Sequence, residues 1–376
     1  MKDISSPLKK KNVKMKKRIK LFDPIVNDKE LSAIGKILKS GLWADGAGLN
    51  KVKQFEQEFG KISGSRFNVA VNSGTAALNI ALSMEDIEKK QVILPSLSFV
   101  STANSVLENN AKPIFGDISL ETLCLDPSEI EDKISDSTKI VLPVHFGGTP
   151  ADLKKIQKIC KKKNLTLIED AAHATGSSHE KVKIGSHGKF VCFSFHPVKN
   201  LAMPTGGLIS INAKDPSNIM KKIKSKRWCG ITDRVKTDYD VKEIGWNYYM
   251  NEFSAAIGIE QIKKLNKLNK IRVNNAKRYA DELTCEEKMP YNHESVYHFY
   301  WILVKNREKL RDELFNNGIE TGTHYKPIHK MSLYNKKIHL PNTEYVGDSI
   351  ITLPTHPNLK QTDLDKIIKI INKFNN

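Results

Sequence analysis

The sequence predicts an α/β protein, with a mostly parallel sheet in a large domain and a smaller α+β domain at the C-terminus. From residue 67 onward, short apolar segments alternate with amphipathic ones, and this order is typical of a parallel sheet with helices on both faces. A long amphipathic segment after residue 252 leads into a region of different organisation. The 376 residues suffice for a large core and two domains. We therefore expect a flexible basic arm at 1–20, a large domain at 21–245 and a small domain at 246–376.

Strands are expected where apolar, β-branched runs end at a polar or turn-forming residue. The clearest run spans 190–195 and ends at His196-Pro197, because proline cannot continue a central strand. The run after Gly207 is expected to return as a hairpin-like edge strand. In chain order, the strands expected in the large domain are 67–71, 92–95, 113–117, 140–145, 165–170, 190–195 and 208–211.

Helices are expected where apolar residues recur on one face. The first begins after Asp23-Pro24, and the glycine-studded loop that follows it at 40–48 suits close approach of a ligand. Other helices of the large domain are expected through 52–59, from 99 to 106, at 152–163 and at 218–227. The small domain is expected to contain a helix from 253 to 271, a strand at 296–304, a helix at 307–317 stopped by Gly318, a strand at 319–325 and a terminal helix through 364–371.

Charge leaves two classes of function open. The formal net charge is +18, part of it from a lysine-rich run at 9–20, and this balance suits either a nucleic-acid-binding protein or an enzyme for an anionic substrate. We find no zinc finger, recognition-helix pattern or aromatic-basic RNA motif, so nucleic acid is the minor alternative. Five scattered cysteines predict neither a metal site nor a disulfide framework. No run is apolar enough for a membrane span or a signal peptide, so we expect a cytoplasmic protein without membrane contact.

Several side chains fall at the ends of the expected strands. These are Ser73, Phe99, His145, Asp170 and Lys199. In an open, mostly parallel sheet, ligands bind beyond the carboxyl ends of the strands. The convergence of these residues at one edge is the strongest physical indication of a site, although His145 is expected to be structural.

Lys199 and Asp170 suggest the chemistry of that site. An ammonium group is costly to bury without a partner, and desolvation lowers an amine's pKa, which favours Schiff-base formation with an aldehyde. A carboxylate that closes an apolar strand also needs a cation in space. Taken alone, a solvated loop lysine and an aspartate paired with a structural cation are the simpler interpretations. Together, the two residues have the logic of a pyridoxal phosphate site, in which aspartate keeps the ring nitrogen protonated.

An ordered set of motifs resembles the DegT/DnrJ/EryC1/StrS family, pyridoxal phosphate-dependent nucleotide-sugar aminotransferases of the fold type I, aspartate aminotransferase-like architecture. The similarity runs from about Leu21 to the C-terminus. The motifs are NSGTAA at 72–77, PSLSFVSTAN at 95–104, PVH at 143–145, EDAAHA at 169–174, FSFHPVKN at 193–200, TGTHYKPIH at 321–329 and LPTHP at 353–357.

The resemblance implies roles around the cofactor, pyridoxal 5′-phosphate. Lys199 would be the Schiff-base lysine and the acid/base that moves the proton, and Asp170 would pair with the pyridinium. His173 would lie near the cofactor's phenolic oxygen, and Phe99 would stack on its ring, for which an aromatic side chain is suited.

The resemblance also implies binding residues and a partner. Gly74, Thr75 and Ser194 would hold the phosphate, while Asn247 would reach the phosphate of the neighbouring subunit's cofactor, which makes a homodimer with shared active sites part of the mechanism. The substrate-side positions would be Trp43, in the loop that runs to Gly48, together with His324 and Tyr325.

The implied function is transfer of an amino group from L-glutamate to a keto nucleotide-sugar, with a 4-keto-6-deoxy hexose favoured, for glycan or surface polysaccharide synthesis. Lysine at position 199 favours transamination, because the family's dehydratase branch has histidine there. Two motifs depart from the family's pattern: MPTGG at 203–207, where many relatives have TGEGG, and NYYM at 247–250, where relatives often have NYRM. The alternatives are a basic nucleic-acid-binding protein or another fold type I enzyme, such as a 3-aminotransferase.

Overall fold

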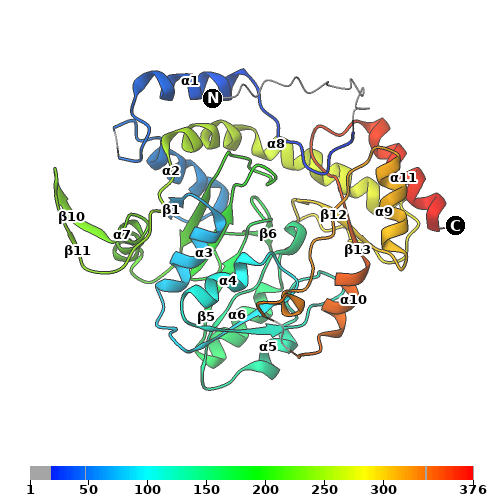
Figure 1. The fold of residues 1–376 in the computed structure, drawn as a ribbon, viewed down its shortest axis with the longest axis horizontal. Coiled ribbons are helices and arrows are strands. Elements are labelled where there is room, and N and C mark those ends of the chain that lie inside the picture. Colours follow the sequence, from blue (N-terminus) through cyan, green and yellow to red (C-terminus); the bar gives the residue numbers. More distant parts are fainter. Residues whose placement is uncertain (1–17, 47, 335–336, 376) are drawn as a thin grey trace, which may run out of the picture.

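A seven-stranded sheet forms the centre of the computed structural model (Figure 1), which describes residues 18–46, 48–334 and 337–375. The strand order is β1-β9-β8-β5-β4-β2-β3, and β9 alone runs antiparallel to its neighbours. The predicted α/β class with a mostly parallel sheet is confirmed. The strands are β1 Phe67–Val71, β2 Gln91–Pro95, β3 Lys112–Gly116, β4 Thr138–Val141, β5 Thr166–Asp170, β8 Phe190–Ser194 and β9 Gly207–Ile211.

The position of β9 corrects one prediction. The strand does return from β8 as an antiparallel hairpin, but it lies between β8 and β1 and is therefore not at the edge of the sheet. Its burial explains this, because all five of its residues are buried. At Gly207 a side chain would collide with the backbone of Ser73, so the absence of a Cβ lets β9 lie this close to the end of β1.

Alternate residues of the strands pack into two separate cores. Val191 and Phe193 of β8 face one cluster, with Phe55 and Phe59 of α2, whereas Cys192 faces the other, with residues of α3. This period of two is what a strand covered on both faces requires. The helices in this part of the chain are α1 Asp28–Ser40, α2 Lys51–Ser63, α3 Gly74–Ser83, α4 Ser101–Glu108, α5 Pro127–Lys133, α6 Leu153–Lys163 and α7 Pro216–Lys226, with the short 3-10 turn η1 Phe146–Gly148.

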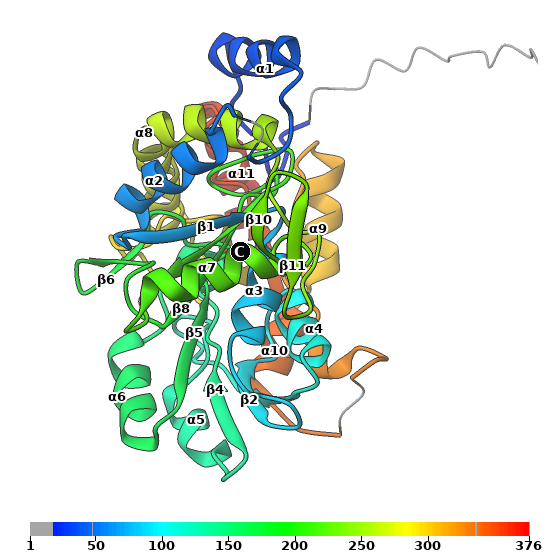
Figure 2. The same ribbon diagram turned by 90° about the vertical axis from the view of Figure 1, so that its left-hand side faces the viewer.

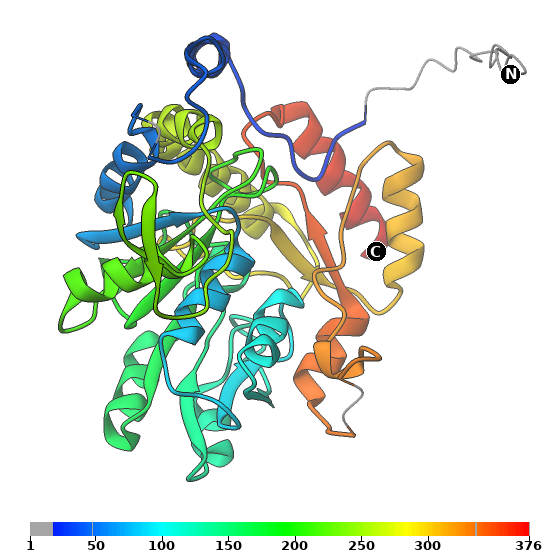
Figure 3. The same cartoon turned by 60° about the vertical axis from the view of Figure 1, so that its left-hand side comes forward.

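The C-terminal part follows the 31-residue helix α8 Glu252–Glu282. It contains the antiparallel pair β12 Tyr300–Leu303 and β13 Ile350–Leu353, covered by α9 Arg307–Asn316, α10 Pro341–Ser349 and α11 Gln361–Asn375. The short turn η2 Ile328–Lys330 lies between α9 and α10. The N-terminal segment runs alongside this part (Figure 3), where Ile19 pairs with Ile319. The division into domains at residue 245 stays a prediction, and residues 1–17 of the predicted arm lie outside the described residues.

The predicted strand at 319–325 is wrong. Only single bridges form there, among them Gly322 with Thr352. Gly322 allows close packing here, since a Cβ would lie 2.6 Å from the His324 ring and 2.7 Å from the Thr352 hydroxyl. The segment after it brings His324 and Tyr325 to the ends of β5 and β8 in the large sheet, instead of forming a third strand beside β13.

Two small hairpins leave the main body. One is β6 Ser178–His179 with β7 Val182–Lys183, and the other is β10 Ile231–Val235 with β11 Asp238–Val241. The β10–β11 hairpin projects from the molecule at the left of Figure 1 and faces the viewer in Figure 2, and most of its residues are exposed. Within the described ranges, the helices include none that is both long and apolar enough to pass through a lipid bilayer. Histidine, cysteine and carboxylate side chains of the same ranges form no cluster suited to a metal ion.

A buried arginine joins the loop after α1 to the sheet. Arg227 donates to Glu56 at 3.0 Å, to the Ala70 carbonyl at 2.6 Å and to Asp45 of the loop at 2.6 Å. Arg227 and Glu56 are each only 7% exposed. Because a buried charge without a partner is costly, this ion pair is expected to matter more for stability than an exposed one.

We expect Arg227→Ala to lower the free energy of unfolding by about 3 kcal/mol, because it leaves the Glu56 carboxylate buried without its guanidinium. Arg278→Ala is the matched control, since Arg278 makes its ion pairs at the surface and the loss should stay below about 1 kcal/mol. Denaturant titration of both variants measures the difference. Equal losses would contradict this assignment.

Candidate active site

A cavity of about 360 Å³ opens at the carboxyl ends of β5 and β8. Both strands contribute their ends to the cavity because they run parallel, as the sequence predicted for the central strands. Side chains from the C-terminal part and from the N-terminal segment close the remaining side. The residues that line the cavity include Phe22, Ser73, Gly74, Thr75, Ser98, Phe99, Asp170, Ala172, His173, Cys192, Ser194, His196, Lys199, Thr205, His324 and Tyr325.

All the site residues predicted from the sequence line this cavity except Trp43 and Asn247. His145, which was expected to be structural, lies behind it, fully buried, with Nε2 2.9 Å from Glu169 and Nδ1 accepting from the Ala151 amide. Its bonds fit the structural role.

Asp170 is held in place by donors to both carboxylate oxygens. The Thr102 hydroxyl donates to Oδ2 at 2.8 Å and the Ala172 amide to Oδ1 at 3.1 Å. Ser98 in turn lies 2.7 Å from the Thr102 hydroxyl. Asp170 is only 5% exposed, and burial raises its pKa despite these donors and the nearby charge of Lys199. A cation placed beside this buried carboxylate would therefore stabilise its charged form strongly.

Lys199 lies in the connection between β8 and β9, just beyond the end of β8. Its backbone amide donates to the His196 carbonyl at 2.8 Å, which fixes the turn that follows the strand. Burial lowers the pKa of Lys199 to about 8, and the charge of Asp170 opposes this shift only in part. An amine with this pKa is neutral far more often near pH 7 than an ordinary lysine is.

Aromatic and imidazole rings form the opposite wall. The Phe22 ring stacks on His298 with 4.9 Å between centroids, and His298 lies 4.6 Å from His173. The His324 ring stacks on Phe299 at 4.9 Å. Burial lowers the pKa of His324 to about 4 and that of His298 well below its usual value, and the nearby charge of Lys199 adds a smaller effect in the same direction. The wall is therefore neutral at physiological pH.

The start of α3 gives one part of the cavity lining that suits a phosphate group. Helix α3 begins there at Gly74, and Ser73 caps it by accepting from the Ala76 amide at 3.1 Å. A Cβ at Gly74 would lie 2.8 Å from the Cβ of Ser194, so glycine keeps Ser194 close to this helix start. Amide groups in the first turn of a helix lack intrahelical acceptors and attract anions. Together with Asp170 and Lys199 in the same cavity, these residues fit pyridoxal phosphate.

Sequence reasoning missed three contributors to the site. Thr102 lies in a motif that was recognised, but its bond to Asp170 depends on how two strand ends meet. Phe22 lines the cavity, and His298 supports it from behind by stacking on Phe22 and lying 4.6 Å from His173. The two residues come from segments far apart in the chain and carry no local pattern that marks them.

Trp43 and Asn247 lie away from the cavity. Trp43 is 50% exposed and packs on Phe253, while Asn247 is exposed and accepts from the Asn72 side chain through its carbonyl. Arg227 connects the segments that carry the two residues. Its guanidinium donates to Asp45, in the same loop as Trp43, and its backbone carbonyl accepts from the amide of Tyr248, which follows Asn247. Both residues are therefore exposed outside the cavity of their own chain.

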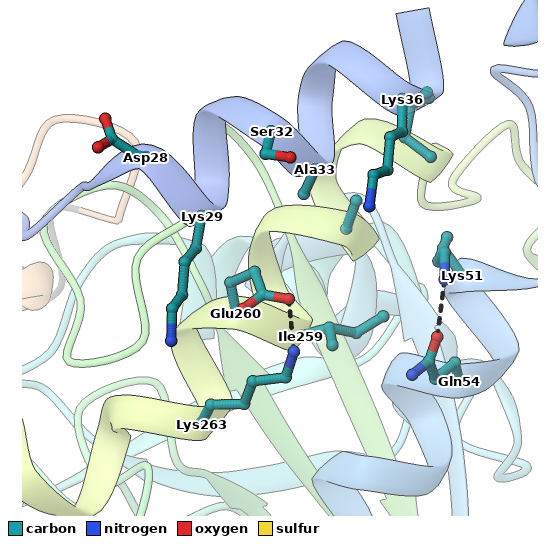
Figure 4. Close-up of a pocket in the computed structure, with 12 residues that line it drawn as sticks. Asp28, Lys29, Ser32, Ala33, Lys36, Lys51, Gln54, Ile259, Glu260 and Lys263 are labelled. Atoms are coloured by element: carbon teal, nitrogen blue, oxygen red, sulfur yellow. Dashed lines mark hydrogen bonds and ion pairs between the residues drawn. The ribbon is translucent and has the colours of Figure 1, made fainter.

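A second hollow, of about 410 Å³, lies between α1, α2 and α8 (Figure 4). Lys263 pairs with Glu260 there, and Lys51 donates to Gln54 at 3.0 Å. None of the predicted site residues lines this hollow. Its lysines lie in the first turns or on the faces of helices, without a buried reactive group, so the cavity beside Lys199 is the candidate active site.

The sequence pattern of the DegT/DnrJ/EryC1/StrS aminotransferase family matches residues 24–372. The chain belongs to this family. It is 33% identical over 380 residues to the uncharacterized protein MJ1066 of Methanocaldococcus jannaschii, covering 94% of this chain and 96% of that protein. The protein is thus an aminotransferase of a pyridoxal phosphate-dependent family.

Solved structures show the same fold. Helicobacter pylori PseC, an aminotransferase involved in the biosynthesis of pseudoaminic acid, is 27% identical, with a TM-score of 0.89 over 95% of this chain and 99% of that one. DesV of S. venezuelae, solved with a ketimine intermediate, is 27% identical with a TM-score of 0.85, covering 92% and 94% of the two chains. The expected fold type I architecture is confirmed.

The Lys199 amine should set the pH dependence of cofactor capture. Because the neutral amine is the nucleophile, the rate at which the aminotransferase takes up added pyridoxal phosphate should rise as pH increases through about 8 and level off above it. Asp170→Asn should move this midpoint to lower pH, because it removes the negative charge that raises the pKa of Lys199. Stopped-flow absorbance at a series of pH values measures both.

Asp126→Asn is the control for that experiment. Asp126 caps α5 and does not line the cavity, and asparagine caps a helix equally well, so the midpoint should not move. A midpoint near that of an ordinary lysine, or an upward shift in Asp170→Asn, would contradict the assignment.

Proposed function

We propose that the enzyme transfers an amino group from L-glutamate to a keto nucleotide-sugar, a 4-keto-6-deoxy hexose, and so supplies an amino sugar for glycan or surface polysaccharide synthesis in the cytoplasm. The observation that carries the proposal is the meeting of Lys199, Asp170 and the start of α3 in one cavity. Membership of the family and the likeness to PseC and DesV support a sugar as acceptor.

The residues divide the work of holding pyridoxal phosphate. When bound, it supplies an aldehyde and a ring that withdraws electrons from the bond being broken. The Asp170 carboxylate, fixed by Thr102 and the Ala172 amide, would hold the proton on the ring nitrogen. Gly74, Thr75 and Ser194 would hold the phosphate, and Phe99 would stack on the ring and exclude water from its face.

The Lys199 amine would act twice. It would first hold the cofactor covalently, and once released it would move a proton between the reacting carbon atoms. Its lowered pKa suits both tasks, since a base that accepts and returns a proton near neutral pH needs a pKa near that pH. The neutral wall of His324 and His298 adds no competing charge beside it.

We further propose that the working form is a homodimer with shared active sites. Asn247 and Trp43 lie outside the cavity of their own chain and are exposed, which leaves them free to reach the cavity of a second copy. The family resemblance assigns Asn247 to the partner's cofactor phosphate, and the exposed position of Asn247 supports this.

A panel of keto nucleotide-sugars tests the reaction. The enzyme is first converted with L-glutamate to its amine form, and each sugar is then added while the visible absorption band of the lysine-bound cofactor is followed. We expect the band to return with 4-keto-6-deoxy sugars, and turnover in Lys199→Ala to fall at least about a hundredfold. Lys189→Ala, which alters a surface lysine paired with Glu85, is the control.

Two results would contradict the proposal. If glutamate converts the enzyme but no sugar restores the band, the acceptor is not a keto nucleotide-sugar. If only 3-keto sugars restore the band, the enzyme aminates position 3 and not position 4.

Mixing two inactive variants tests the shared sites. Lys199→Ala and Asn247→Ala chains, refolded together, should regain roughly a quarter of wild-type activity, because half of the dimers are mixed and each contains one site with both residues. Recovery requires Asn247 to act on the partner's site. If the mixture stays as inactive as the separate variants while mixed dimers form, the proposal of shared sites is wrong.

A further inference from the structure

Arg272 is a buried cation without a protein partner. It lies on α8 and is only 5% exposed. Among the described residues, Nε and Nη1 of its guanidinium have no hydrogen-bond partner, and no carboxylate of these residues forms an ion pair with it. Arg227 is buried to a similar degree, yet it pairs with both Glu56 and Asp45. Since an isolated buried charge is costly, Arg272 calls for an anion.

Three segments of the chain meet beside Arg272. Asn275, one turn later on α8, donates from its side chain to the Thr355 carbonyl at 3.1 Å. The Thr355 hydroxyl donates in turn to the His298 carbonyl at 3.3 Å. Residues three apart on a helix share a face, so Arg272 is directed toward the same segments. Its charge is one of the smaller causes, after burial, that lower the pKa of His298, as expected of a neighbour.

Two further buried groups beside Arg272 can donate a hydrogen bond. Asn269, one turn earlier on α8, donates to the Thr175 carbonyl at 3.0 Å, and the His298 ring lies 4.6 Å from that of His173, two residues before Thr175. Thr175 is 1% exposed and His298 is 2% exposed. The Thr175 hydroxyl and His298 Nδ1 have no partner within the described ranges. A hydroxyl can donate, and a neutral imidazole can carry its proton on Nδ1.

The other polar atoms left without a partner in this region are acceptors. His356 Nε2 donates to a backbone carbonyl of the N-terminal segment at 2.9 Å, so Nδ1 presents a lone pair. Asn200 Oδ1 is also an acceptor, while its amide nitrogen already donates twice. A guanidinium has five N–H groups, so it can serve such acceptors and an anion together. The anion is therefore expected on the side of Thr175 and His298.

We propose that Arg272, the Thr175 hydroxyl and His298 Nδ1–H form a buried binding site for a small inorganic anion, and that the ligand is chloride. Arg272 lines neither the cavity beside Lys199 nor the hollow between α1, α2 and α8, so the site is separate from the candidate active site. A closely packed interior favours an ion of about the size of a water molecule. The inference needs neither cofactor nor substrate and goes beyond the proposed function.

The bound ion would join α8 to the support of the cavity wall. His298 stacks on Phe22, which lines the cavity, so an ion held between Arg272 and His298 would fix this support from behind. Because the unfolded chain lacks the site, chloride would stabilise the folded state by mass action. Water could satisfy the same donors, but it has no charge to compensate the guanidinium. A dependence of stability on chloride therefore distinguishes the two.

The test is thermal unfolding of the full-length protein in mixtures of potassium chloride and potassium gluconate at constant ionic strength. Gluconate is too large for a buried site. Raising chloride from about 1 mM to about 200 mM should raise the unfolding temperature of the wild type by about 2 °C or more. In Arg272→Met, which replaces the cation with an apolar chain, this rise should disappear. Added pyridoxal 5′-phosphate should leave the rise unchanged, because Arg272 does not line the cavity.

Two variants serve as comparisons. Arg278→Met alters an arginine of the same helix that pairs with Glu282 and Asp365 at the surface, so its response to chloride should equal that of the wild type. Thr175→Val removes one donor hydroxyl at nearly constant volume. The chloride concentration for half of the effect should then increase about tenfold.

Bromide locates the ion without any variant. Crystals of the wild-type protein grown in sodium bromide should show an anomalous-scattering peak within hydrogen-bond distance of the Arg272 guanidinium, and this result decides even if Arg272→Met does not fold. Density for water alone at the guanidinium overturns the inference. An equal response to chloride in the wild type and Arg272→Met also overturns it. Each of these outcomes leaves the proposed transamination standing, since the panel of keto sugars tests that separately.

Discussion

The burial of two opposite charges at neighbouring strand ends is the constraint on which the site depends. Strands β5 and β8 pair so that Asp170 lies opposite Cys192, and the chain then turns to bring Lys199 over the same edge. Burial raises the pKa of Asp170 and lowers that of Lys199, so both charged forms are disfavoured. A cationic ring bound against the carboxylate, with the amine used in a covalent bond, would relieve both penalties at once.

The rest of the fold keeps this arrangement rigid. Thr102 and Ala172 fix the carboxylate, while β9, inserted between β8 and β1, holds the connection that carries Lys199. The C-terminal part supplies the neutral wall through His324 and Tyr325, which line the cavity because the chain around Gly322 does not continue as a strand beside β13. A site whose groups are held before the ligand arrives loses less free energy on binding it.

The sequence predicted what is local and missed what depends on distant contacts. Strand ends such as Asp170 and Lys199 could be found because alternation and proline are local signals, and the edge at which they meet follows from parallel topology. The placement of β9 and the absence of a strand at 319–325 could not be found, since strand order depends on pairing across the whole sheet. Phe22 was not predicted as a site residue for the same reason, because its contact with His298 joins segments more than 270 residues apart in the sequence.

The charges in the cavity give a further reason to expect a second copy. Among the described residues that line it, Lys199 is the only lysine or arginine, yet the proposed substrates carry two carboxylates or a diphosphate. The surface around Asn247 is different, because Trp228, which pairs with Asn247, has the Arg234 guanidinium of the β10–β11 hairpin 4.9 Å above its ring. A partner that brings Asn247 to the cofactor would bring this arginine with it. The cations that the cavity lacks in one chain would then come from the other, so recognition of anionic substrates would depend on assembly.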